Sequence, residues 1–265
     1  MRGGSRCLKG KVVFITGASG GIGEATARAL VAQGANVVLA ARRCERLAAL
    51  QQELGEYQVL AFACDVRERT QVRSALEAGK AHFGRLDAVI NNAGRGLYAS
   101  VTEMDTQDRQ DLWAVNVQGA LYVMQESVPL LTRGGVLVNV SSIVAKVATP
   151  YMGGYSASKA ALSALSDALR IEQSAQGIRV ITVYPGSTET EFRQKAPGWA
   201  LASEKRIVRV SADRVAQVIV EALTSSRSRV WVTWRDRLAA ALALRFPTVS
   251  DWVLRRYQCP KRRGL

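Results

Sequence analysis

Four glycines that follow a short apolar run constrain the fold of this chain more than any other feature. The apolar run covers residues 11–16, a helical pattern covers residues 24–33, and between them stand Gly17, Gly20, Gly21 and Gly23. A strand, a tight loop and a helix are the natural interpretation. A second apolar run, Val37–Ala41, follows the end of that helix. Residues 11–41 therefore predict a strand–helix–strand unit.

The same alternation continues along the chain. Further apolar runs typical of buried strands lie at residues 58–64, 86–90, 136–140, 178–184 and 229–233. Helical patterns cover residues 44–54, 68–82, 106–131, 155–175 and 212–223. Strands that alternate with helices form a parallel sheet covered on both faces. We predict an α/β protein with a doubly wound Rossmann fold, in which a seven-stranded parallel sheet carries helices on both faces.

No repeat or low-complexity linker divides the chain, and its length requires only one core. We expect a single domain over residues 1–234, followed by a basic amphipathic C-terminal extension over residues 235–265. The short basic N-terminus has no apolar run typical of a secretory signal. The apolar stretch Leu238–Leu244 is far shorter than the roughly 20 residues of a membrane-spanning helix.

Cysteine and histidine content argues against several kinds of site. The chain has four cysteines, which are far apart and show no CxxC spacing: Cys7, Cys44, Cys64 and Cys259. Free thiols in a reducing, cytoplasmic setting are the better interpretation. His82 is the one histidine, and we interpret it as a surface or helix-end residue. Most zinc sites and a Ser/His/Asp hydrolase are thereby disfavoured, and no metal is expected.

The glycine loop also predicts a ligand. A loop of this kind lets backbone amides and a helix N-terminus face a pyrophosphate, which indicates dinucleotide binding. The end of the second strand then selects the dinucleotide, because a carboxylate there binds a ribose 2′-OH whereas arginine suits a 2′-phosphate. Here Ala41 precedes Arg42 and Arg43, so NADP(H) is predicted in preference to NAD(H). The alternative is that both arginines are solvated residues at a helix start.

Tyr155 and Lys159 are candidates for acid–base chemistry. They are four residues apart, so on a helix their side chains share one face. A neighbouring ammonium favours tyrosinate and would lower the phenol pKa from about 10. Tyr155 is therefore a candidate proton donor to a carbonyl, or base toward an alcohol. Tyr151 has no lysine four positions later, and we interpret it as a pocket or loop residue.

Six features in this order resemble the short-chain dehydrogenase/reductase family. They are the TGxxxGIG loop at Thr16–Gly23, the NNAG segment at Asn91–Gly94, the helical Asn116, the NVSS strand end at Asn139–Ser142, the YSASK segment at Tyr155–Lys159, and Pro185-Gly186. The resemblance extends from about residue 11 to residue 232, and the combined motifs are highly specific.

The resemblance implies the catalytic residues Asn116, Ser142, Tyr155 and Lys159. Ser142 lies thirteen positions before Tyr155, the usual separation in the family, so it rather than Ser141 should hydrogen-bond the substrate oxygen. Lys159 should also hold the nicotinamide ribose, and Asn116 should anchor a water chain that resupplies the proton.

The resemblance also implies a set of cofactor contacts, among them an adenine contact at Asp65, a cofactor floor at residues 92–94 and a carboxamide contact at Thr190. The full set is Gly17, Ser19, Gly20, Gly21, Ile22, Gly23, Arg42, Arg43, Asp65, Val66, Asn92, Ala93, Gly94, Tyr155, Lys159, Pro185, Gly186, Thr188 and Thr190. One departure is that many NADP-using relatives have a basic residue where this chain has Gly20. The coenzyme prediction therefore depends on Arg42, helped by Arg43.

Residues 189–210 correspond to the stretch that folds over the substrate in this family. They carry the large apolar residues Phe192, Pro197, Trp199 and Leu201, which favour an apolar ketone, aldehyde or secondary alcohol. Alternatively these side chains only pack the segment onto the sheet. Further expected walls of the pocket are Leu97, Tyr98, Val147, Tyr151 and Met152.

The basic C-terminal extension leaves three interpretations open. The net charge of the chain is +14, and residues 227–265 hold ten basic residues against Asp236 and Asp251, a difference of +8. Apolar residues between arginines suggest amphipathic helices. They could pack on their own domain or a neighbouring subunit, make peripheral contact with an anionic membrane, or bind nucleic acid, which is the least favoured.

These observations predict an NADP(H)-dependent oxidoreductase that transfers a hydride between the nicotinamide and a carbonyl or alcohol, with Tyr155 as general acid/base. The resemblance also implies a homodimer or homotetramer that assembles through the helices holding Asn116 and Tyr155. The alternative is a non-enzymatic NADP(H)-sensing protein that acts through its basic tail. The intact set of four catalytic positions argues against that alternative.

Overall fold

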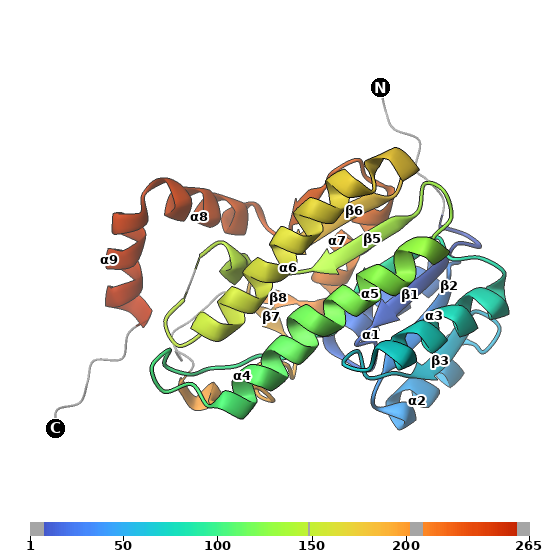
Figure 1. Ribbon diagram of the computed structural model, residues 1–265, viewed down its shortest axis with the longest axis horizontal. Coiled ribbons are helices and arrows are strands. Elements are labelled where there is room, and N and C mark those ends of the chain that lie inside the picture. Colours follow the sequence, from blue (N-terminus) through green and yellow to red (C-terminus); the bar gives the residue numbers. More distant parts are fainter. Residues whose placement is uncertain (1–7, 148, 202–208, 259–265) are drawn as a thin grey trace.

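A single parallel sheet forms the centre of the computed structural model, which describes residues 8–147, 149–201 and 209–258 (Figure 1). Cys7, Cys259, residues 202–208 and the last seven residues of the predicted extension lie outside the described part. The strands of the sheet are β1 (Val12–Thr16), β2 (Asn36–Ala41), β3 (Val59–Ala63), β4 (Ala88–Asn91), β5 (Val136–Val140), β6 (Arg179–Tyr184) and β9 (Arg229–Trp231). Their order is β3-β2-β1-β4-β5-β6-β9, and every neighbouring pair is parallel.

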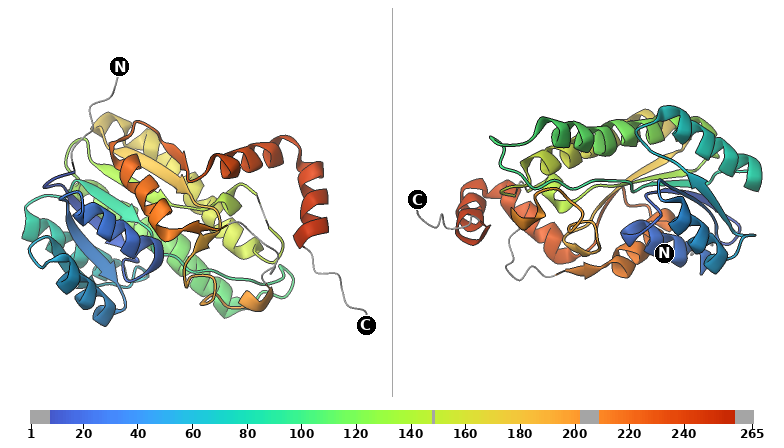
Figure 2. Two further views of the ribbon diagram at one scale, coloured as in Figure 1. Left: turned by 180° about the vertical axis from the view of Figure 1, so that it is seen from behind. Right: turned by 90° about the horizontal axis from the view of Figure 1, so that it is seen from below.

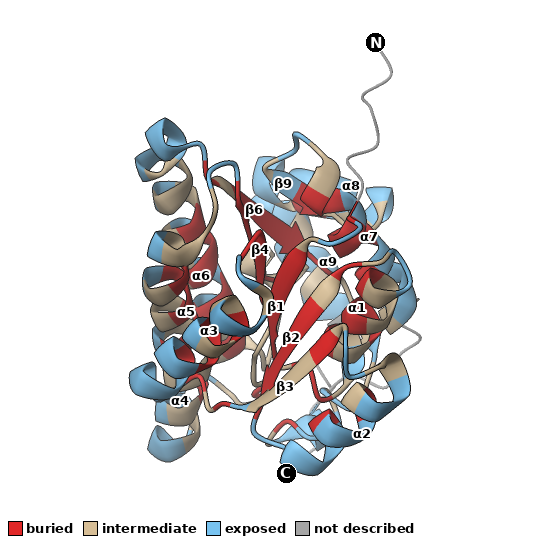
Figure 3. Ribbon diagram, turned by 90° about the vertical axis from the view of Figure 1, so that its right-hand side faces the viewer, coloured by how far each residue is buried: buried red, intermediate tan, exposed pale blue. Residues whose placement is uncertain are grey.

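Two helical layers cover the sheet, which is visible edge-on in Figure 2. One layer contains α1 (Gly21–Val31), α2 (Cys44–Leu54) and α7 (Ala212–Thr224); the other contains α3 (Arg69–Phe83), α5 (Ala120–Ser127) and α6 (Gly153–Glu172). Strand β1 is buried along its whole length, because Val13 and Ile15 pack under the first layer while Val12 and Phe14 pack under the second (Figure 3). The predicted doubly wound fold is confirmed.

The helix predicted over residues 106–131 is interrupted. It consists of α4 (Thr106–Trp113), a π-helical segment (Ala114–Gly119), α5 and a short 3₁₀ turn (Val128–Leu130). The π segment brings Asn116 into the interior, where its side chain is completely buried. A Cβ at Gly119 would lie 2.8 Å from Val66 Cγ2, so glycine is needed where this segment meets the loop after β3. Apolar periodicity continues through such a bulge and does not reveal it.

Two further features are a second, short pair of strands and the helices that follow β9. Strands β7 (Thr188–Glu189) and β8 (Val210–Ser211) form a short parallel pair that the sequence did not predict. After β9 come α8 (Trp234–Arg245) and α9 (Pro247–Gln258), which together we call the C-terminal arm. Both views in Figure 2 show this arm standing away from the helical layers. Within the residues that the structure describes, no helix is long and apolar enough to cross a membrane.

Candidate functional site

The glycine loop joins β1 to α1 through a very tight turn. Gly17 has a φ of 68°, and a Cβ there would lie 2.9 Å from the Ala93 Cα. A Cβ at Gly23 would lie only 2.3 Å from the Gly17 carbonyl oxygen. Because Gly20 offers no side-chain cap, the first amides of α1 keep their donors available. This backbone fits a pyrophosphate placed at the N-terminus of α1.

Residues that follow β4 hold the start of this loop by hydrogen bonds. The Thr16 hydroxyl oxygen accepts hydrogen bonds from the backbone amides of Asn92 and Ala93, each at 3.0 Å. The Asn92 side-chain amide donates to the Thr16 carbonyl oxygen, also at 3.0 Å. The Asn92 side chain therefore supports the glycine loop, in addition to the position beside the cofactor that the sequence indicated.

The two arginines after β2 differ in their contacts. The Arg43 guanidinium donates to the Ser19 hydroxyl at 3.1 Å and to the Ser19 carbonyl at 2.8 Å, which places it over Gly20. Arg42 is exposed and lines the same cavity. Sequence reasoning gave Arg42 the leading role, whereas the contact with the glycine loop belongs to Arg43.

Arg43 and Arg46 also approach a carboxylate that the sequence analysis missed. The Glu191 Oε2 atom lies 3.4 Å from Arg46 Nη1 and 3.9 Å from Arg43 Nη1. The two arginines precede and begin α2, while Glu191 lies in the segment predicted to cover the substrate. The local pattern of neither segment indicates the pairing, because the residues are far apart in sequence.

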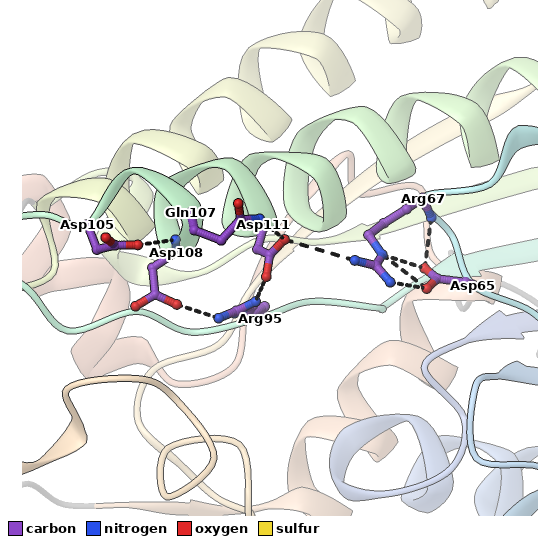
Figure 4. Close-up of polar contacts among 7 residues, drawn as sticks. All are labelled: Asp65, Arg67, Arg95, Asp105, Gln107, Asp108 and Asp111. Atoms are coloured by element: carbon purple, nitrogen blue, oxygen red, sulfur yellow. Dashed lines mark hydrogen bonds and ion pairs between the residues drawn. The ribbon is translucent and has the colours of Figure 1, made fainter.

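A chain of ion pairs connects the end of β3 with α4 (Figure 4). Arg67 lies 2.6 Å from Asp65 and 4.0 Å from Asp111, and Arg95 pairs with both Asp111 and Asp108. The hydrogen bond from Arg67 is the main cause that lowers the pKa of Asp65, which is therefore an ionised acceptor at neutral pH. Arg67, Arg95 and Asp111 line the cavity, and the sequence analysis did not select them.

Tyr155 and Lys159 lie one turn apart at the start of α6. Burial raises the pKa of Tyr155, while a hydrogen bond from Ser142 acts in the opposite direction. The Lys159 ammonium lies 5.9 Å from the centre of the Tyr155 ring and donates to the Val140 carbonyl at 2.9 Å. Burial lowers the pKa of Lys159 to about 8. The expected lowering of the Tyr155 pKa is thus wrong for the protein without ligands, because desolvation of the phenolate outweighs the opposing effects.

Ser142 ends β5 beside this pair. Its hydroxyl accepts a hydrogen bond from the Val144 amide at 3.3 Å and reaches the Pro185 carbonyl at 3.5 Å. Ser141 instead points into the core, where its hydroxyl contacts Ser163 at 2.9 Å. The preference for Ser142 over Ser141 stays a prediction from the family resemblance, since both serines line the cavity.

Asn116 lies behind Lys159 and does not line the cavity. Its side chain accepts from the Arg95 amide at 2.8 Å and donates to the Arg95 carbonyl at 2.9 Å and to the Ser158 hydroxyl at 3.0 Å. A Cβ at Gly94 would lie 3.4 Å from the Asn116 oxygen and 3.5 Å from the Lys159 nitrogen. A glycine at position 94 therefore leaves room for the Asn116 and Lys159 side chains.

The segment after β6 covers the other side of the site. A Cβ at Gly186 would lie 2.8 Å from an oxygen of Asp236, so glycine makes room for the first turn of α8. The Thr188 hydroxyl donates to the Gly186 carbonyl at 3.3 Å. The Thr190 methyl group packs near Gly21, where a Cβ would approach it to 3.1 Å.

The glycine loop, the start of α6 and the segment after β6 all line one cavity of about 1200 Å³. Of the predicted site residues it is lined by Gly17, Ser19, Gly20, Gly21, Ile22, Arg42, Arg43, Asp65, Val66, Asn92, Ala93, Gly94, Ser142, Tyr155, Lys159, Pro185, Gly186, Thr188 and Thr190. Gly23 and Asn116 lie behind this lining. The cavity exceeds the roughly 300–1,000 Å³ of usual ligand pockets, and so has room for more than one ligand.

The predicted apolar walls are brought into the cavity in part. Tyr98, Val147, Tyr151, Met152, Phe192 and Leu201 line it. Leu97 instead packs beneath Tyr155 in a buried cluster with Leu112. Tyr151 is a loop residue with a φ of 62° as well as a pocket residue. A wall that was not foreseen comes from the arm, through Ala239, Leu242, Ala243, Phe246, Val249, Ser250, Val253 and Leu254.

The described residues contain neither a disulfide nor a group of metal ligands. Cys44 and Cys64 are both free, and Cys64 is buried at the cavity edge. In the part of the chain that the structure covers, no three histidine, cysteine or carboxylate side chains gather into a potential metal site.

Comparisons with known proteins identify the family. A sequence model described as short chain dehydrogenase matches residues 11–200. An uncharacterized oxidoreductase of Staphylococcus epidermidis is 33% identical over 219 residues, which are 82% of this chain and 92% of that protein.

Solved structures give the same result. A short-chain dehydrogenase from Burkholderia cenocepacia in complex with NADP superposes with a TM-score of 0.81 and 26% identity, covering 96% of this chain and 99% of that one. A 3-ketoacyl-(acyl-carrier-protein) reductase from Brucella melitensis complexed with NADH has a TM-score of 0.73 and 27% identity, covering 85% and 97%. The protein is an oxidoreductase that belongs to the short-chain dehydrogenase/reductase family.

Proposed function

We propose that this protein is an NADP(H)-dependent oxidoreductase that interconverts a ketone or aldehyde with the corresponding alcohol. The observation that carries the proposal is the single cavity that holds both the N-terminus of α1 and the Ser142, Tyr155 and Lys159 side chains. A nicotinamide dinucleotide bound there would supply or accept the hydride at the substrate carbon. The family relatives whose structures hold NADP or NADH support this use of the cavity.

Three side chains act on the substrate oxygen in this proposal. The Ser142 hydroxyl donates a hydrogen bond that polarises the carbonyl. Tyr155 then transfers its phenolic proton to the oxygen as negative charge develops, so the products are the alcohol and a tyrosinate. Burial raises the pKa of Tyr155, which keeps the proton on the phenol before the reaction. In alcohol oxidation the same proton moves in the reverse direction.

Lys159 and Asn116 act behind Tyr155. The Lys159 ammonium would stabilise the tyrosinate by its charge and would hold the nicotinamide ribose, and its hydrogen bond to the Val140 carbonyl supports this role. We propose that Asn116 anchors a water chain through which the proton of Tyr155 is replaced. Its amide is fixed by the backbone of Arg95, which sets the shape of this region.

The preference for NADP(H) is proposed from the arginines at the end of β2. Arg43 lies on the glycine loop and Arg42 at the cavity edge, and no acidic residue follows Ala41 to bind a ribose 2′-OH. Asp65 and Val66 would contact the adenine, and Thr188 and Thr190 the nicotinamide end. These assignments follow the family resemblance together with the cavity lining.

The substrate is proposed to be apolar, and the protein to work as a homo-oligomer. Tyr98, Met152 and Phe192 give the cavity near Tyr155 an apolar lining. The family resemblance supports a cytoplasmic homodimer or homotetramer formed through α4–α5 and α6, with residues 1–234 as the catalytic domain. Sedimentation velocity tests the assembly, and a monomer at micromolar concentration would refute it.

Nicotinamide absorbance tests the coenzyme preference. Purified protein receives NADPH or NADH with a panel of apolar ketones, aldehydes and diketones, beside the variants Arg43→Asp and Arg42→Asp. We expect NADPH-selective turnover and, in Arg42→Asp, a loss of NADPH affinity of roughly tenfold or more with little change for NADH. Arg43→Asp also removes the hydrogen bonds to Ser19 in the glycine loop and should weaken the binding of both coenzymes. An equal effect of Arg42→Asp on both coenzymes would refute the 2′-phosphate assignment.

A further inference from the structure

The C-terminal arm is at the same time a wall of the cavity and an exposed apolar surface. Leu242, Phe246, Val249 and Val253 all line the cavity. They are nevertheless 49%, 50%, 59% and 39% exposed, respectively. The apolar lining of the substrate side therefore includes side chains that are accessible to solvent.

The rest of the arm is apolar and cationic. Trp234, Leu238, Leu244 and Trp252 are 70%, 49%, 65% and 61% exposed and do not line the cavity. The guanidinium of Arg235 lies 5.6 Å from the Trp234 ring centre, and that of Arg245 lies 5.3 Å from the Phe246 ring centre. Exposed apolar side chains and arginines are thus neighbours along the arm.

Charge distinguishes among the partners that could cover this surface. A second copy that docks arm to arm would bring together two segments that each carry five arginines against two aspartates, a net charge of +3 over residues 234–258. A nucleic acid would bind the arginines but would leave Leu244 and Val249 in water. An anionic bilayer accommodates both the arginines and the apolar side chains, since arginine binds lipid phosphates while tryptophan and leucine enter the interface.

The place of the arm in the molecule agrees with such a surface. In Figure 1 the arm forms one end of the protein, and α2 and α3 lie at the other. A flat partner can therefore meet the arm while the rest of the body stays in water.

We propose that the arm docks on an anionic lipid bilayer and that the cavity takes a long-chain ketone, aldehyde or alcohol directly from the lipid. The substrate would enter between the inner face of the arm and the body of the protein and present its oxygen to Tyr155. The delivery step rests on the proposed function, whereas docking does not.

Vesicle sedimentation tests docking. Wild type is mixed with vesicles of phosphatidylcholine alone or with added phosphatidylserine, beside the double variant Leu244→Ser/Trp252→Ser. The control is Tyr57→Ser, which removes a side chain that is 97% exposed on the body. We expect binding only to the anionic vesicles, a loss of about tenfold or more in the arm variant, and none in the control. Equal losses in both variants, or no binding by wild type, would overturn docking.

A pair of substrates tests delivery. We expect the arm variant to keep its rate on a short water-soluble ketone within about twofold, and to lose roughly tenfold on a long-chain ketone dissolved in anionic vesicles. An unchanged rate on the vesicle substrate, with vesicle binding lost, overturns delivery and leaves the proposed function intact. If wild type reduces neither ketone, the proposed function and delivery both fail, and sedimentation still decides docking.

Discussion

At the scale of single residues, the glycine loop owes its shape to contacts that only glycine allows. A Cβ at Gly23 would meet backbone at 2.3 Å, whereas a Cβ at Gly20 would meet the movable end of the Arg43 side chain at 3.0 Å. Two glycines of the same motif therefore tolerate a methyl group very differently. The sequence identifies both as motif glycines and does not rank them.

Substitution by alanine makes this difference measurable. We expect Gly23→Ala to weaken NADPH binding by at least about a hundredfold or to unfold the loop. The new methyl group would meet the Gly17 carbonyl, and the backbone at neither glycine can move aside. Gly20→Ala should weaken binding by less than about tenfold, because Arg43 can shift. Coenzyme fluorescence titration and thermal unfolding of both variants check this, and similar losses in the two would contradict it.

Burial of Lys159 couples stability to pH. Its pKa is about 8 in the folded protein against 10.5 for the exposed side chain, so the folded state binds this proton more weakly. Below about pH 8 the buried ammonium lowers the free energy of unfolding. This loss of stability disappears as the pH rises to 10.5.

The Lys159→Met variant isolates this contribution. Below pH 8 the variant should be more stable than wild type, by up to about 3 kcal/mol, since no buried ammonium remains. The gap should close between pH 8 and 10.5. Chemical denaturation of both proteins without coenzyme, across this pH range, measures it. A gap that is constant with pH would contradict the account.

At the scale of elements, the interrupted helix α4–α5 shows what sequence reasoning could not supply. The apolar pattern predicted a helix over residues 106–131, and helical structure is present over most of that range. The π segment depends on Gly119 meeting Val66 and on Asn116 bonding to Arg95, and these contacts join residues distant in sequence. The family motif nevertheless identified Asn116 as a candidate without its local geometry.

Arg95 links the loop after β4 to α4, and its removal tests that link. We expect Arg95→Ala to lower kcat roughly tenfold, because the backbone that fixes Asn116 loses its anchor to Asp108 and Asp111. The coenzyme KM should change less than about threefold. Arg109→Ala, an exposed residue of the same helix, is the control. Steady-state kinetics across pH would contradict the link if both variants behaved alike.

At the scale of the whole molecule, the sheet was predictable because each strand can be recognised from its own short stretch of sequence. Parallel strands buried on both faces are continuous apolar runs, so their positions were predicted to within about two residues at most ends. The short β7–β8 pair and the arm wall of the cavity were not predictable, because they depend on how distant segments meet. The candidate site came from motifs, and the structure added Arg46, Arg67, Arg95 and Glu191 to its surroundings.

In the proposed function, the fold brings the Tyr155 phenol to the carbonyl oxygen of a substrate. The most direct measurement is NADPH consumption by wild type and Tyr155→Phe with an apolar ketone, together with NADPH titration of both. We predict that the variant binds NADPH within about threefold of wild type and loses at least about a hundredfold in kcat. A variant that retained wild-type turnover, or a wild type that bound NADPH and reduced no carbonyl, would contradict the account.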